Sequence, residues 1–293
     1  MPTPVTHSNG TLDVAVSPLG AELQSARLRG CEYIWQGDPA YWDGRSPVLF
    51  PICGRLFERR YTYGGREYSM DLHGFARTSL FRASRSPAGD AATFTLAADD
   101  ATRAQYPFDF ELALTYRLEG ATLVVAASVR NHGSGTLPFS YGGHPGLNVP
   151  LGGEGAFEDW FLEFEPGVCP DRFEFTPNAL VTGRKFAFPL APGNRLPLRH
   201  SLFDRAGIFL DRAGRSLALR SDRSERSVTV RFPDMPYLGL WHAPDSDAPY
   251  VCVEPWSGLP SYDGAPDDFA TRHDMVRLAA GASATLRYSL EFR

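Results

Sequence analysis

Apolar and polar residues alternate without a break from Phe110 to Leu118, and this pattern is the strongest constraint on the fold. A β-strand points successive side chains to opposite faces, so the segment predicts a strand with one buried face. Glu119-Gly120 predicts a turn, and a second alternating run from Leu123 to Val129 predicts the returning partner strand. The pair is typical of an antiparallel sheet.

Further short segments of the same kind are separated by turns rich in glycine and proline. Because almost no long helical period interrupts them, the chain is expected to be all-β, with a large antiparallel β-sandwich as its architecture and a barrel as the related alternative. No linker or repeat divides residues 1–293, so we expect a single domain. The predicted strands are Leu12–Val16, Thr93–Leu96, Leu202–Asp211, Leu217–Leu219, Val228–Phe232, Tyr237–Trp241, Tyr250–Glu254 and Leu286–Phe292, with a hairpin over Tyr61–Ser69.

Charge and cysteine content exclude several classes of protein. The formal net charge is −5, which disfavours nucleic acid or an anionic membrane surface as a partner. The N-terminal residues lack a basic region followed by an apolar one, so no signal peptide is expected, and no apolar run reaches the ~20 residues that a membrane helix needs. The four cysteines show no CxxC spacing and are expected to be free thiols. A cytoplasmic protein is the expectation, as a monomer or a homodimer.

One short stretch, Phe139–Pro150, points to chemistry. It places His144 between a glycine pair, Gly142-Gly143, and Pro145. Glycine permits unusual backbone bends and proline restricts the residue before it, so we expect a stiff, tightly bent segment that aims the imidazole. A histidine that transfers protons needs such placement.

Glu254 is the expected companion of His144. In Tyr250–Glu254 the alternation puts Val251 and Val253 on one face and Cys252 and Glu254 on the other, and Pro255 is expected to end the strand. A carboxyl group at the end of an apolar strand is partly desolvated, which raises its pKa and makes it a better base. The alternative is a surface glutamate or the partner of an arginine. We interpret His144 and Glu254 as an acid/base pair in a sugar site.

Four further residues are candidates for the same site, although a turn histidine bonded to backbone is an equal alternative for His73. Pro47 and Pro51 disfavour a central strand over Ser46–Leu56, so this segment is expected to be buried, irregular and to deliver Arg55, whose fork of donors suits vicinal hydroxyls or a carboxylate. The others are His73 in a His-Gly turn, Asp204 as a hydroxyl acceptor, and Trp241, which with Trp256 can stack on a sugar face or simply fill the core.

Other chemistries have less support in the sequence. His73, His144 and Glu254 match a known zinc ligand set, but no local metal-ligand spacing accompanies them, so no metal is expected. Phosphate-binding glycine motifs and a nucleophile elbow are absent from the sequence.

Several ordered motifs, from SPLGAEL near the start to VCVEPW near the end, resemble the aldose 1-epimerase (galactose mutarotase-like) family, and most of all its LacX-type branch. The other matching pieces are FPICGRL, YTYGGREYSMDLHGFAR, GGHPGLNVP, LFDRAGIFL and YVCVEPWSG. The resemblance implies a β-sandwich with an open sugar cleft and no cofactor.

The resemblance also implies roles for individual residues. His144 is expected to be the general acid and Glu254 the general base of an isomerase, a mutarotase that interconverts hexose anomers, while Arg55 and His73 orient the sugar. At Asp204 the family has an acidic residue directly before an apolar strand, whereas here Arg205, Ala206 and Gly207 intervene.

Two alternatives stay open on the sequence alone. One is a non-catalytic carbohydrate-binding or sugar-sensing protein on the same fold, since a fold does not fix a function. The other is a mutarotase of hexose 6-phosphates, with Arg55, Arg59, Arg60 and Arg77 as a phosphate clamp.

Overall fold

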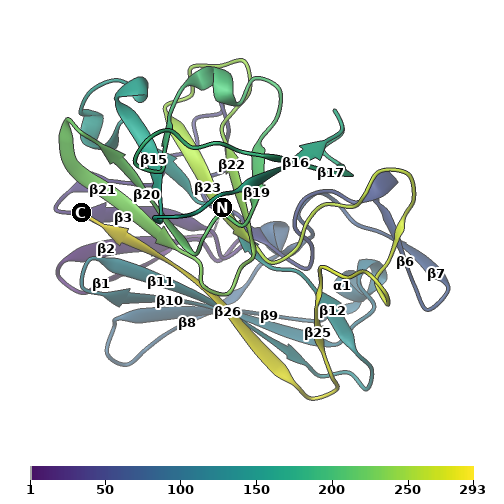
Figure 1. Ribbon diagram of the computed structural model, residues 1–293. Helices are drawn as coiled ribbons and strands as arrows, with labels where there is room; N and C mark the ends of the chain where they lie inside the picture. The colour runs from purple at the N-terminus through teal and green to yellow at the C-terminus, as the bar shows by residue number, and fades with distance from the viewer. Residues whose placement is uncertain (1) are drawn as a thin grey trace.

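Two large antiparallel sheets dominate the computed structural model, which describes residues 2–293. In Figure 1 the strands β8 to β11 and β26 form the lower layer, and β16, β19, β22 and β23 lie above it. The all-β prediction is therefore confirmed. The first sheet runs in the order β18 (Arg195–Pro197), β15 (Trp160–Phe164), β20 (Ser216–Ser221), β21 (Ser224–Arg231), β26 (Ser283–Phe292), β11 (Thr122–Asn131), β10 (Phe110–Glu119), β9 (Ala91–Ala97) and β8 (Arg82–Arg85).

The second large sheet carries the residues of interest for function. Its order is β17 (Val181–Ala187), β16 (Asp171–Phe175), β19 (Ile208–Asp211), β22 (Tyr237–Trp241), β23 (Tyr250–Trp256), β13 (Gly142–Gly143) and β5 (Val48–Leu49), and β14 (Gly146–Asn148) also pairs with β23. All seven residues of β23 are buried.

Smaller elements complete the described part of the chain. They are a sheet of β1 (Val5–Ser8), β2 (Leu12–Val16), β3 (Leu23–Leu28) and β4 (Cys31–Glu32); a sheet of β24 (Asp267–Asp268), β6 (Arg60–Tyr63) and β7 (Arg66–Ser69); the pair β12 (Leu137–Phe139) and β25 (Val276–Leu278); the helix α1 (Asp100–Gln105); and the 3₁₀ turns η1 (Phe57–Arg59), η2 (Ala76–Thr78), η3 (Leu151–Gly153), η4 (Phe157–Asp159) and η5 (His200–Leu202). No helix within residues 2–293 is long and apolar enough to cross a bilayer.

The main core lies where the inner faces of the two large sheets meet. The predicted alternation holds in β10, whose apolar residues from Phe110 to Leu118 are buried in register with β11. Val251 and Val253 of β23 belong to the same apolar cluster. A Cβ added to Gly143 of β13 would lie 2.7 Å from the ring of Tyr288 on β26, so the two sheets approach closely at that point. Burial of apolar surface between the layers is the main force that holds them together.

Several predicted strand boundaries differ from the structure, and two of the errors lie close to the residues of interest. The strand expected over Leu202–Asp211 begins only at Ile208, because η5 and the polar segment around Asp204 and Arg205 precede it. The strand expected to end at Glu254 continues to Trp256. Val253 donates its N–H to the Pro145 oxygen at 3.1 Å, so the next residue of the same parity, Pro255, turns its nitrogen toward the same edge of β23, which faces β13, and away from β22. Its missing N–H therefore removes no hydrogen bond between β23 and β22.

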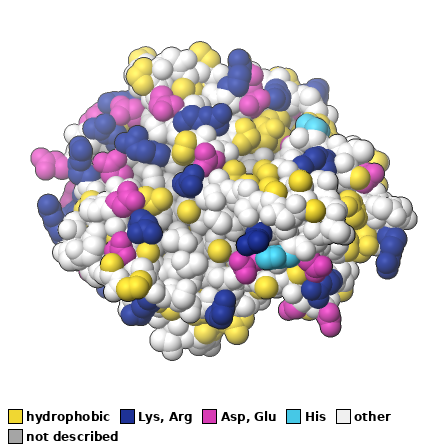
Figure 2. All heavy atoms as spheres, turned by 90° about the horizontal axis from the view of Figure 1, so that it is seen from below, with side chains coloured by type: hydrophobic (Ala, Val, Ile, Leu, Met, Phe, Trp, Pro, Cys, Tyr) yellow, Lys and Arg dark blue, Asp and Glu magenta, His cyan; other side chains and the backbone are white. Residues whose placement is uncertain are grey.

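Charged side chains are mixed on the surface. On the face seen in Figure 2, basic and acidic side chains are interspersed, and the described residues there form no uniformly basic patch. All four cysteines are free, as expected from their spacing.

The β10 alternation generates a stability prediction. Leu114 is fully buried, and Leu114→Ala is expected to lower the free energy of unfolding by about 2–5 kcal/mol, because it leaves a cavity between the sheets. Urea unfolding measures the change. Glu119→Ala, at the exposed end of the same strand, is the control and should change stability by less than about 0.5 kcal/mol. An equal effect of both changes would contradict the assignment of the buried face.

Candidate active site

The outer face of the second large sheet, which points away from the first sheet, forms the site. On β23 the side chains alternate as predicted: Val251 and Val253 enter the main core, while Cys252 and Trp256 belong to separate small clusters on the other face. Glu254 shares that outer face. Its register partner on β22 is Gly239, which has no side chain to cover the carboxyl group.

His144 lies in an interruption of the pairing with β23. Gly142 of β13 pairs with Trp256, and Gly146 of β14 pairs with Cys252, so His144 and Pro145 occupy the interval beside Glu254. The glycines of this segment do not provide the unusual backbone bends that were expected of them. Gly142, Gly143 and Gly146 do not have positive φ. They allow close approach instead, because a Cβ on Gly142 would lie 2.8 Å from Trp256 Cδ1.

The two candidates for proton transfer, His144 and Glu254, lie close together and are almost inaccessible to water. His144 Nε2 lies 3.2 Å from Glu254 Oε2, and the two side chains are only 10% and 2% exposed. Burial lowers the pKa of His144 to about 3. Burial also raises the pKa of Glu254 well above its usual range, an effect that the nearby Trp256 indole opposes in part. Both shifts favour the uncharged forms, as desolvation predicts.

Each member of the pair also keeps one buried polar atom without a partner. Among the described residues, His144 Nδ1 and Glu254 Oε1 make no hydrogen bond. Buried polar groups are normally satisfied, so orphaned atoms at one point call for an explanation. Both residues line the cavity described below.

His73 is held in one orientation by backbone contacts. The Gly54 N–H donates to His73 Nδ1 at 3.0 Å, so the neutral imidazole carries its proton on Nε2. Burial, with the charges of His144, Arg77 and Arg55, holds the pKa of His73 well below its usual range. The ring stands edge-on to His144, with centroids 5.7 Å apart. His73 is therefore a neutral donor beside the acid/base pair.

Tryptophan rings surround the pair. Trp42 lies against His144 with ring centroids 5.1 Å apart, and Trp241 meets the same imidazole edge-on at 5.8 Å. Apolar rings exclude water and offer flat faces to a sugar ring. Trp42 comes from the loop after Trp35, whose indole donates to the Trp42 carbonyl oxygen at 2.9 Å.

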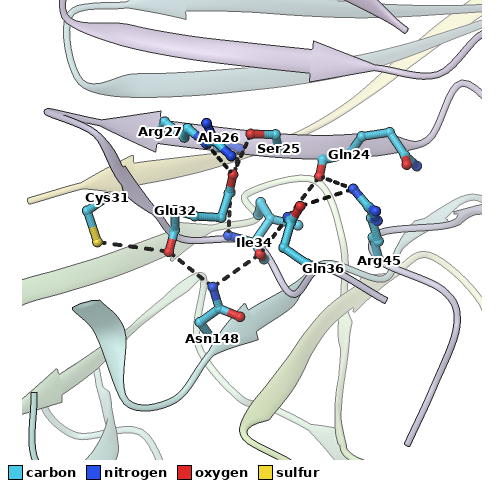
Figure 3. A network of polar contacts seen from close by, with 10 residues as sticks. All are labelled: Gln24, Ser25, Ala26, Arg27, Cys31, Glu32, Ile34, Gln36, Arg45 and Asn148. Carbon is cyan, nitrogen blue, oxygen red and sulfur yellow. Dashed lines mark hydrogen bonds and ion pairs between the residues drawn. The ribbon is translucent and has the colours of Figure 1, made fainter. Parts of the chain in front are cut away.

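A polar network fixes the strand that follows His144, as Figure 3 shows. Asn148 of β14 donates to the carbonyl oxygens of Glu32 and Ile34 at 3.0 and 3.2 Å. The Glu32 carboxylate in turn accepts from the backbone N–H groups of Ala26 and Ile34 at 2.9 and 3.0 Å. These bonds tie β14 to the hairpin of β3 and β4, and so restrict the position of His144, four residues before Asn148.

A cavity of about 440 Å³ opens over the pair, within the size range of small-molecule sites. It brings together five of the predicted site residues. The sixth, Asp204, does not line it, whereas its neighbour Arg205 does. The lining includes Arg55, His73, His144, Trp241 and Glu254 of the predicted set, and Trp42, Arg77, Phe175, Arg205, Phe209 and Trp256 among the others.

Trp42 and Phe209 are two of the lining residues that sequence reasoning missed. Phe209 carries a detectable signal, because its neighbours on β19, Ile208 and Leu210, face the core and the alternation therefore sends Phe209 outward. Trp42 lies in an irregular loop, where no periodicity reports the direction of a side chain.

Comparisons with known proteins identify the family of this chain. The family model described as aldose 1-epimerase matches residues 4–268. The chain belongs to the aldose 1-epimerase family. Among curated proteins, the plasmid-encoded protein LacX of Lactococcus lactis subsp. lactis is 35% identical over 260 residues, which is 86% of each chain.

Solved structures of family members superpose closely. A galactose mutarotase-like protein from Lactobacillus casei ATCC 334 gives a TM-score of 0.92 at 35% identity, covering 99% of this chain and 100% of its own. A galactose mutarotase related enzyme from Lactobacillus acidophilus gives 0.92 at 32% identity, covering 99% and 97%. Both the predicted family and its LacX-type branch are therefore confirmed.

Among the described residues, the side chains of His144, Cys252 and Glu254 lie close enough together to hold a metal ion. The donor atoms of His144, Cys252 and Glu254 lie within 4.8 Å of one another. The zinc set weighed from the sequence used His73 instead of Cys252. Burial and the charge of Glu254 hold the pKa of the Cys252 thiol well above its usual range. The absence of a metal stays a prediction.

The raised pKa of Glu254 predicts a pH-dependent stability difference. The folded protein holds this proton at pH values where the unfolded chain has released it, so stability falls as pH rises from about 4.5 to the folded pKa. Glu254→Gln removes the effect. The variant should match wild type near pH 5 and become more stable at higher pH, by up to about 1.4 kcal/mol per pH unit across that window.

Urea unfolding between pH 5 and pH 8 measures this difference. Glu119→Gln, an exposed glutamate, serves as the control and should follow wild type throughout. A Glu254→Gln variant that parallels wild type at every pH would show that the carboxyl group is not held in its neutral form.

Proposed function

We propose that this protein is a mutarotase that interconverts the α and β anomers of a hexose, with Glu254 as the base and His144 as the acid. The observation that carries the proposal is the 3.2 Å contact between these two groups at the floor of a cavity of about 440 Å³. Membership in the aldose 1-epimerase family supports it.

The contact suits the geometry of the reaction. The hydroxyl that loses a proton and the ring oxygen that gains one are both bonded to C1 of the sugar. Acid and base must therefore converge on one carbon atom, as neighbouring groups on one sheet face do. In the forward step Glu254 takes the proton of the C1 hydroxyl, His144 donates a proton to the ring oxygen, and the C1–O ring bond breaks to give the open-chain aldehyde.

Reversal of the same steps gives the other anomer. Rotation about the C1–C2 bond presents the opposite face of the carbonyl group to the returning hydroxyl. His144 then takes the proton of that hydroxyl, and Glu254 returns a proton to the new C1 oxygen. Acid and base exchange roles, so one pair serves both directions.

The protonation states of the pair fit this cycle. The reactive form is a carboxylate beside an imidazolium, which differs from the uncharged pair by one proton moved across the 3.2 Å contact. Ring opening leaves Glu254 protonated and His144 neutral. Burial favours those uncharged forms, so the buried environment stabilises the pair while the aldehyde is present.

The other predicted residues have supporting roles in this proposal. His73, with its proton on Nε2, donates to a sugar oxygen, and Arg55 donates to hydroxyls from the cavity wall. Trp241 and Trp42 provide apolar surface for the sugar ring. The contact of Asp204 with the sugar stays a prediction, since this side chain does not line the cavity.

Removal of either proton-transfer group tests the proposal. Glu254→Gln and His144→Asn should each lower the rate of anomer exchange by about 10²–10⁴-fold while sugar binding persists, because shape and donors remain but proton transfer does not. Exchange is measured by NMR on freshly dissolved single anomers, and binding by calorimetry. The exposed residues His132 and Glu119 provide matched controls as His132→Asn and Glu119→Gln.

Each outcome has a separate meaning. Near-normal exchange in Glu254→Gln or His144→Asn would remove that residue from the mechanism. Sugar binding without any acceleration by the wild-type protein would replace the enzyme with a sugar-binding or sensing protein on the same fold.

A further inference from the structure

Arginine side chains line much of the cavity wall. Arg55, Arg77 and Arg205 face the cavity, and Glu254 is the acidic residue in its lining. Burial keeps His73 and His144 uncharged near neutral pH. The cleft is thus cationic in a chain whose formal net charge is −5. A local field opposite to the net charge favours an anionic ligand.

The arginines near the site divide into two kinds. Arg59 pairs with Asp71, and Arg60 pairs with Glu58 and Glu67. Within residues 2–293, Arg55, Arg77 and Arg205 form no ion pair with an acidic side chain. The four-arginine clamp considered from the sequence therefore reduces to Arg55 and Arg77, and Arg205 is added from another segment.

Arg55 and Arg77 lie at the junction of two hollows. Both line the cavity above the acid/base pair, and both line a second hollow of about 360 Å³ that also contains Gln105 and Thr78. A sugar whose C1 lies at His144 and Glu254 can extend its other end toward this junction. The charge of Arg77 lowers the pKa of both His73 and His144, which places its guanidinium within electrostatic reach of these two imidazoles.

Backbone contacts fix the two segments that carry these arginines. Phe50 pairs with Gly74 in a parallel bridge, and Ala76 donates its N–H to the Phe50 oxygen at 3.2 Å. Gly54 and His73 exchange two further hydrogen bonds, one through the imidazole and one through the backbone. Arg55 and Arg77 thus leave neighbouring, mutually bonded segments, which holds their side chains on the same part of the wall.

We propose that the substrate is a hexose with an anionic group, a phosphate or a carboxylate, at the end remote from C1, and that Arg55 and Arg77 bind this group while Arg205 adds positive potential. A guanidinium presents a planar fork of donors that matches both anions. This inference rests on the proposed function, since it places C1 at the acid/base pair.

Anomer exchange on three sugars tests the proposal: glucose, glucose 6-phosphate and glucuronic acid. We expect kcat/KM for one or both anionic sugars to exceed that for glucose by about 10- to 100-fold, the range of a charged hydrogen bond. The two anionic sugars distinguish phosphate from carboxylate. The preference should decline as salt is raised from 0.05 to 0.5 M, because screening weakens the attraction.

Arg77→Gln and Arg55→Gln should each reduce the preference about 10-fold or more, mainly through KM for the anionic sugar. Arg82→Gln, an exposed arginine on β8 outside the cavity, is the matched control and should retain the wild-type preference. Urea unfolding of each variant shows whether it is folded, and two separate arginine variants keep the test valid if one is not.

The outcomes separate this inference from the proposed function. Exchange of glucose with equal or lower kcat/KM for both anionic sugars would overturn the anion site and leave the mutarotase intact. So would a preference that survives in both arginine variants. Calorimetric binding of glucose 6-phosphate that weakens in Arg77→Gln, without acceleration of any exchange, would support the anion site and overturn the catalytic function. Neither binding nor exchange would overturn both.

Discussion

The contact between His144 and Glu254 determines what the rest of this structure must provide. Two ionisable groups 3.2 Å apart, with side chains 10% and 2% exposed, cannot be held in a nearly dry site by their mutual attraction alone. The surrounding backbone holds them. β23 is fixed by β22 on one edge and by β13 and β14 on the other, and the interruption between β13 and β14 holds His144 beside Glu254.

Alternation along β23 places the side chains that pack the core and the candidate catalytic side chain on opposite faces of the sheet. Val251 and Val253 contribute apolar area to the main core, while Cys252, Glu254 and Trp256 face the other side of the sheet. A strand buried on both faces can thus supply core packing with one set of side chains and a reactive group with the other. Burial of the two candidate catalytic groups costs free energy, because Glu254 Oε1 and His144 Nδ1 have no hydrogen-bond partner among the described residues.

Sequence reasoning found the features that depend on neighbours along the chain. The alternation of Phe110–Leu118 gave the correct strand and face, and the motif around His144 named a residue that lines the cavity. Features set by partners outside the local pattern were missed or misread. The end of β23 depends on the pairing of Trp256 with Gly142 of β13, the glycines near His144 depend on Trp256, and the direction of Trp42 depends on a loop contact with Trp35.

The positive charge of the arginines in the cavity wall affects the protonation of the buried residue His144. The positive charge of Arg77 disfavours the imidazolium form of His144, the form that would donate a proton to the ring oxygen in the proposed mechanism. For an uncharged sugar the wall would therefore oppose catalysis, since nothing in the substrate offsets its charge. An anionic group bound at the wall neutralises part of that charge and raises the basicity of His144. Substrate binding would then favour the reactive form of the pair, which connects specificity to proton transfer through one electrostatic effect.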